Sequence, residues 1–188
     1  MEKKYRLLEN DTIMVGSRTL YRIEALKDFV NVKKGDKGGY IESDDNLSHI
    51  GACWVSDYAR VSGDAQVFGN AWIFGNAEIF GNARVSGNAR VSGNARVSDN
   101  AEVYGDAEIR STRDYVVLKN IWSSGRYFTY TRSNKMWKVG CFYGTGEELI
   151  AKAYRDSEVS GREYKRVVEY VEAMYADLEN DERQEAKK

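Results

Sequence analysis

The chain contains 188 residues, with 28 Lys and Arg against 29 Asp and Glu, so its formal net charge is −1. This length suits one domain or two small ones, and the balanced charge argues against a nucleic-acid-binding protein, which would carry a basic patch to neutralise phosphates. No apolar run approaches the roughly 20 residues of a membrane span, and the first residues lack the apolar centre of a signal peptide, so we expect a cytoplasmic protein without a membrane partner.

Residues 1–50 contain short apolar runs separated by turn-forming residues. The runs are YRLL, TIMV and LYRI, and they precede FVNVKKGDKGGYIES, in which glycines and lysines indicate turns. We predict an N-terminal β cap that ends in a first irregular coil, with DNLSHI as a degenerate repeat.

Residues 51–110 consist of ten consecutive hexads. They are GACWVS, DYARVS, GDAQVF, GNAWIF, GNAEIF, GNARVS three times, DNAEVY and GDAEIR. Gly, Asn and Asp at the first two positions tolerate the left-handed backbone conformation and form a corner. The next four residues alternate, so that Ala (once Cys53) and Val or Ile share one face of a short strand. A corner every six residues predicts a β-solenoid.

The phrase VSGNAR resembles the hexapeptide repeat of left-handed parallel β-helices. That resemblance implies triangular coils of three hexads, in which residues 18 apart stack on one face. The stacks at the fourth position are Arg60-Glu78-Arg96, Gln66-Arg84-Glu102 and Trp54-Trp72-Arg90-Glu108. They contain opposite charges and no like pair, whereas a 12-residue coil would set Arg84 against Arg96, so the charges favour the triangle and have a structural explanation as cross-strand pairs.

Residues 111–178 predict a different module. Three strands, DYVVLKNIW, RYFTYTR and MWKVGCF, are separated by the turns SSG and SNK and suggest an antiparallel sheet. Thr145 with Glu148, and Ser160 with Glu163, fit capping boxes and predict two helices. Residues 179–188, ENDERQEAKK, lack apolar residues and predict a disordered tail. The fold class is therefore mainly β: a short left-handed β-helix with an N-terminal β cap and a C-terminal α+β module.

Aromatic residues at outward positions of the hexads are candidates for an interface. Phe68, Phe74 and Phe80 occupy the sixth position of consecutive hexads, and Trp54 and Trp72 share a face with Phe74. Exposed patches of this kind mark interfaces, so we expect a homo-oligomer, with a trimer favoured. The alternative is that cap segments fold back over these rings.

A second candidate site is the turn SSGR. Ser123, Ser124 and Arg126, with Trp122 and Trp137 nearby, could hold a small anion or nucleotide through the guanidinium and backbone donors. An ordinary hairpin turn is the alternative.

The hexapeptide repeat also occurs in acyltransferases that use coenzyme A. That resemblance implies a His residue that acts as the catalytic base. His49 is the only histidine, lies before the regular repeat, and is expected to be a surface or capping residue. Within one protomer, a single His cannot supply the three-His zinc site of carbonic anhydrases of this fold, and the alternative is a threefold axis that gathers His49 from three chains. Cys53 and Cys141 are expected to be buried free thiols. We predict no catalytic residue, metal or cofactor, and lean against an enzyme.

The segments LYRIEALKDFVNVKKGDKGGYIES, NLSHIGACWV and GCFYGTGEELIAKAY look similar to a group of hexapeptide-repeat proteins from phages, prophages and bacteria. Members are often labelled transferases on the repeat alone, and the group implies no established activity. The leading hypothesis is a non-enzymatic binding or assembly protein. The resemblance adds the alternative of an anti-defence protein that binds a host signalling nucleotide or a host defence protein.

Overall fold

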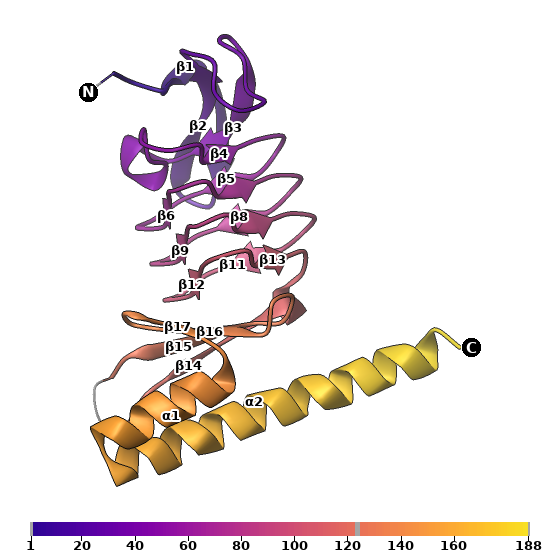
Figure 1. Cartoon of the computed structure of the whole chain (residues 1–188). Helices are drawn as coiled ribbons and strands as arrows, with labels where there is room; N and C mark the ends of the chain where they lie inside the picture. Colours follow the sequence, from indigo (N-terminus) through magenta and orange to yellow (C-terminus); the bar gives the residue numbers. More distant parts are fainter. Residues whose placement is uncertain (1, 123–124, 188) are drawn as a thin grey trace. The chain divides into compact units, whose positions relative to one another are not determined.

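The computed structural model describes residues 2–122 and 125–187. The chain divides into two compact units, Met1–Tyr115 and Val116–Lys188, which we describe separately (Figure 1). The first unit extends beyond the hexads to Tyr115, whose side chain forms hydrogen bonds with the backbone of the hexad 93–98. Its hydroxyl donates to the Arg96 carbonyl at 3.0 Å and accepts from the Ser98 N–H at 3.3 Å.

The hexads form a β-solenoid of triangular coils. Each coil contributes one two-residue strand to each of three parallel sheets, and paired residues are 18 apart, as predicted from the charges. The first sheet contains β4 (Trp54–Val55), β7 (Trp72–Ile73), β10 (Arg90–Val91) and β13 (Glu108–Ile109). The second contains β5 (Arg60–Val61), β8 (Glu78–Ile79) and β11 (Arg96–Val97), and the third contains β6 (Gln66–Val67), β9 (Arg84–Val85) and β12 (Glu102–Val103).

The inside of the solenoid is filled by the third and fifth residues of the hexads. Every such Ala, Val and Ile from Val55 to Ile109 is at most 1% exposed. Backbone amides point along the solenoid axis, so that the amide of Trp72 donates to the Ala89 carbonyl of the next coil at 2.9 Å. Burial of small apolar side chains and the ladder between coils therefore stabilise the same strands.

The N-terminal cap extends one of these sheets. Strands β1 (Tyr5–Val15), β2 (Arg18–Ala25) and β3 (Lys37–Ile41) pair antiparallel, and β3 then pairs parallel with β5. The short 3-10 helix η1 (Asp44–Asn46) follows. Asn46 is buried, and its amide nitrogen donates to the Gly63 and Ala65 carbonyls at 2.9 Å each, which covers the edge of the third sheet.

The second unit is an antiparallel sheet with two helices, as predicted, but the sheet has four strands instead of three, because a turn at Gly140 and Cys141 divides the predicted strand MWKVGCF. After η2 (Thr112–Asp114), the strands are β14 (Tyr115–Lys119), β15 (Tyr127–Thr131), β16 (Met136–Val139) and β17 (Phe142–Gly144). The helices are α1 (Gly146–Asp156) and α2 (Glu158–Glu185). Phe128, Tyr130 and Trp137 of the sheet pack with Val168 and Val171 of α2 in one buried cluster.

Two further predictions for this unit were wrong. Helix α2 begins one turn before the predicted capping box, because the Ser157 hydroxyl accepts the Ser160 N–H at 3.1 Å. The predicted disordered tail is helical through Glu185. Long-range and local charge contacts hold it, since Arg132 pairs with Glu182 at 2.6 Å and Arg183 pairs with Glu179 at 3.7 Å.

Among the described residues, no helix is both long and apolar enough to cross a membrane.

The corners of the solenoid generate a first prediction. Gly87 has φ +72°, and a Cβ there would lie 2.7 Å from the Gly105 nitrogen of the next coil, whereas Gly16 in the β1–β2 turn has φ +60° and open space around it. Gly87→Ala should lower the free energy of unfolding by more than ~2 kcal/mol, and Gly16→Ala by only ~1 kcal/mol, the cost of the backbone conformation. Urea unfolding followed by circular dichroism measures both, and equal losses would contradict the close approach at the corner.

Candidate functional site

The outward surface of the solenoid carries one arginine-phenylalanine pair on each face. Phe68, Phe74 and Phe80 are half-buried, and Arg84, Arg90 and Arg96 belong to the following coil. The guanidinium carbons lie 5.2, 5.5 and 5.2 Å from the ring centroids, in the order of the chain. The predicted aromatic belt is thus covered in part by cation-π contacts rather than by bare apolar surface.

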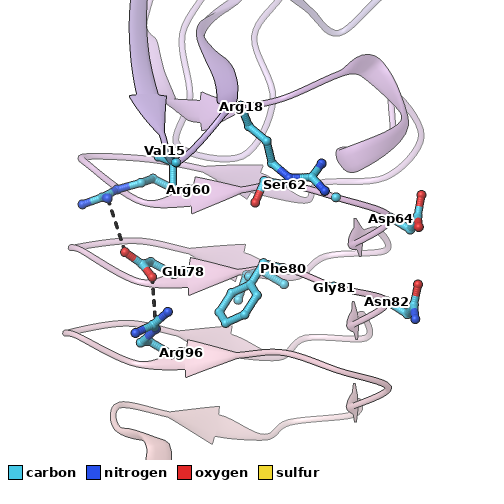
Figure 2. A pocket seen from close by; sticks show the side chains of 13 residues that line it. Val15, Arg18, Arg60, Ser62, Asp64, Glu78, Phe80, Gly81, Asn82 and Arg96 are labelled. Atoms are coloured by element: carbon cyan, nitrogen blue, oxygen red, sulfur yellow. Dashed lines mark ion pairs between the residues drawn. The ribbon is translucent and has the colours of Figure 1, made fainter.

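The face formed by β5, β8 and β11 contains a cavity of about 420 Å³ below the turn of the β1–β2 hairpin (Figure 2). Its central charge is Glu78, whose carboxylate oxygens lie 3.3 Å from Arg60 Nη1 and 3.1 Å from Arg96 Nε. Phe80 and Arg18 also line the cavity. Figure 2 shows Arg18 reaching down from the hairpin toward this face.

Arg18 is held by Glu42. Its Nη1 donates to both carboxylate oxygens of Glu42, at 2.8 and 2.7 Å, and one of these oxygens also accepts the Gly63 N–H at 2.7 Å. The Gly63 N–H and the Arg18 guanidinium together hold the pKa of Glu42 below its ordinary value. The cavity therefore combines guanidinium groups, two paired with Glu78 and one with Glu42, with the carboxylate of Asp64 and an aromatic ring.

The face formed by β4, β7 and β10 differs because the cap covers its first tryptophan. Trp54 is only 3% exposed and packs edge-on against Phe29 at a centroid distance of 5.3 Å. The prediction that Trp54 points outward is therefore wrong. For this ring the alternative applies, in which a cap segment folds back over it. Trp72 stays half-buried, with its Nε1 donating to the Ala52 carbonyl at 3.2 Å. Beside it, Val30 is 66% exposed and lines the same hollow.

The cap brings together Lys4, His49 and Cys53, which lie apart in the sequence and have side chains capable of acid-base or nucleophilic chemistry. Lys4 and Cys53 are buried, and the His49 side chain is 19% exposed and stacks on Tyr5 at 4.3 Å. His49 Nδ1 accepts the Lys4 N–H at 3.1 Å, and burial lowers the pKa of His49 below its ordinary value of 6.5. His49 is thus a capping residue rather than a surface base. Lys4 was missed because no local pattern marks a buried lysine.

The predicted ligand turn in the second unit is only partly described. Ser123 and Ser124 lie outside the described residues, and Arg126 is exposed. Trp137 is fully buried and serves the core, whereas Trp122 is half-buried and packs against Phe128 and Tyr164. Of the two cysteines, Cys53 is buried as predicted, whereas Cys141 is exposed between β16 and β17 because it lies at their turn.

Comparison with known proteins supports the fold. Three overlapping stretches, residues 77–93, 83–98 and 89–105, match a family model described as the YdcK beta solenoid repeat. They run from β8 to β12, within the regular coils described above. No curated protein matches the chain. The match and the coil geometry identify a β-solenoid protein.

Two substitutions separate the contribution of the arginine-phenylalanine contacts to stability from that of the ion pair between Arg96 and Glu78. Arg90→Gln removes only the described contact with Phe74 and should cost about 0.5–1 kcal/mol of unfolding free energy. Arg96→Gln also removes the Glu78 ion pair and should cost about 0.5 kcal/mol more, because the Arg96 side chain is 60% exposed and water screens the pair. Urea unfolding at low salt and at about 1 M NaCl tests this, since screening should remove the difference between the variants. A difference that persists at high salt would contradict it.

The buried His49 predicts an acid sensitivity. Because its pKa is lowered in the folded state, the unfolded chain takes up this proton first, and stability falls as the pH drops below 6.5 toward the folded pKa. His49→Asn retains an acceptor for the Lys4 N–H but does not titrate. Urea midpoints at about pH 7.5 and about pH 5 should therefore differ less in the variant than in the unchanged protein. An equal loss in both would exclude His49 as the cause.

Proposed function

We propose that the chain is a non-enzymatic binding or assembly protein that uses its solenoid as a scaffold and self-associates, with a trimer favoured. The observation that carries the proposal is the outward surface around Trp72, where the exposed Val30 lies beside Trp72 and Arg90 on one hollow. Phe74 continues this surface under Arg90. Tryptophan, phenylalanine and arginine are the residue types that interfaces favour, and a second copy of the chain would cover them.

The residues that could perform acid-base or nucleophilic chemistry support the same proposal. His49 is held between Tyr5 and the Lys4 backbone, and Cys53 is 0% exposed. A base inside the cap cannot reach an alcohol or amine acceptor, so the acyltransferase naming of similar repeat proteins receives no support from its position.

A second candidate function is binding of a small anionic ligand, including a host signalling nucleotide. It is favoured by the cavity on the β5–β8–β11 face, which Arg18, Arg60, Arg96 and Phe80 line together with Glu78 and Asp64. Thermal shift assays with cyclic dinucleotides and with acetyl-coenzyme A separate this function from an acyltransferase, because a bound ligand raises the midpoint by mass action. A shift with nucleotides alone, lost in Arg60→Gln, would support it.

The interface can be tested with substitutions that the repeat itself uses. Position four is Arg and position six is Ser in the hexads GNARVS, so Trp72→Arg combined with Phe74→Ser should preserve the coil. Light scattering at tens of micromolar should show an oligomer for the unchanged protein and a monomer for the double variant. Tyr170→Ser, at an exposed position of α2, is the matched control and should leave the oligomer intact. A monomeric unchanged protein would refute self-association.

A further inference from the structure

The buried amine of Lys4 lies against a buried thiol. Lys4 is 1% exposed, and its Nζ lies 3.2 Å from Cys53 Sγ. The other hydrogen-bond partners of this amine in the described chain are the Cys53 carbonyl at 2.7 Å and the Gly51 carbonyl at 3.4 Å. No described carboxylate forms an ion pair with it. The amine is therefore enclosed by two carbonyls, a sulfur and the Phe29 ring, whose centroid is 5.3 Å away.

Within the ten hexads, sulfur occurs at one inward position only, and that position lies beside the Lys4 amine. Cys53 occupies the third position of its hexad, and each of the nine other hexads from 57 to 110 has Ala there. That position points into the solenoid, and in the first coil it faces the segment that leads into β1. The chain thus departs from its own repeat at the single inward position that contacts Lys4.

The surroundings favour the neutral forms of both groups. Burial lowers the pKa of Lys4 and raises the pKa of the Cys53 thiol. Lys4 Nζ donates to Sγ as well as to the two carbonyls, and the Cys53 thiol has the Ser48 carbonyl at 3.4 Å as its own acceptor. The 3.2 Å separation of Nζ and Sγ brings both atoms within reach of a single bridging oxygen atom.

We propose that Lys4 and Cys53 are the site of a reversible covalent modification, an N–O–S bridge between amine and thiol, with dioxygen as the oxidant. In the net reaction, one N–H bond, the S–H bond and the O=O bond break, and N–O, O–S and two O–H bonds form. One oxygen atom becomes the bridge and the other leaves as water with the two released hydrogens. Nitrogen and sulfur each lose two electrons, and dioxygen accepts all four.

The bridge would fasten the start of the chain to the first coil. It closes a loop between positions 49 residues apart and joins the segment before β1 to the carbonyl edge that the cap covers. A cross-link of this kind stabilises chiefly by restricting the unfolded chain. Reduction by two equivalents of a dithiol, which supply the four electrons and four protons, would restore the amine, the thiol and one water, so the stability of the cap would follow the redox state.

Intact-mass measurement tests the modification directly. After exposure to air, the protein should be about 14 Da heavier than after reduction, the mass of one oxygen gained and two hydrogens lost, and peptide mapping should link residues 4 and 53. Cys141→Ser removes the exposed thiol and should keep this change. Cys53→Ala, which restores the residue of the repeat, and Lys4→Met should both abolish it.

The outcomes that would overturn the proposal are also distinct. A gain of about 16 or 32 Da on Cys53 without linked peptides would show oxidation to sulfenic or sulfinic acid instead, and an unchanged mass in air would show no modification. Thermal unfolding gives a second measurement. The oxidised protein should melt several degrees above the reduced one, whereas Cys53→Ala should melt at the same temperature in both states, and a difference that survives in Cys53→Ala would refute the bridge. The oligomeric state is measured separately, so failure here leaves the proposed assembly untouched.

Discussion

The hydrogen bonds between successive coils are the constraint on which the first unit depends. Because the Trp72 amide donates to the Ala89 carbonyl and the Arg90 amide to the Ala107 carbonyl, each residue is placed directly beside the one 18 positions away. The corners must then approach one another closely, which explains why Gly87 faces Gly105. Side chains at corners are stacked by the same register, so that Asn88 accepts from Asn70 and donates to Asp106. One periodic ladder thus determines corner, interior and surface together.

The same register explains where the three identical hexads place their side chains. Residues 81–98 are one complete coil, so the repeated phrase supplies Arg84, Arg90 and Arg96 to three different faces. Each of these arginines lies over a phenylalanine of the preceding coil. The coil before them has Phe at all three sixth positions, so the repeated Arg at position four matches the coil on which it packs. On one face the arginine has a second partner, Glu78, and on another it lies beside Trp72, so one pattern produces surfaces with different chemistry.

The sequence was sufficient for the features that depend on period alone. The corners, the buried Ala and Val or Ile positions, and the Arg60-Glu78-Arg96 stack follow from hexads and a coil of 18 residues. The contacts between Phe80 and Arg96 were not anticipated, because they join positions six and four of adjacent coils and not equal positions. Burial of Trp54 by Phe29, and the helical end of α2 paired with Arg132, depend on segments distant in the chain. Local composition carries no signal for such contacts.

The direction of the ladder also explains the chemistry of the two ends of the solenoid. Amides donate toward the next coil, so the first coil is left with carbonyl groups that need donors. On two faces the cap provides Asn46 and the backbone amides of Tyr40 and Glu42, and on the third it provides Lys4. At the other end an amide needs an acceptor, and the Tyr115 hydroxyl accepts from Ser98. Lys4 is thus buried because the carbonyl groups of the first coil need a donor. Those carbonyl groups do not by themselves require the neighbouring Cys53.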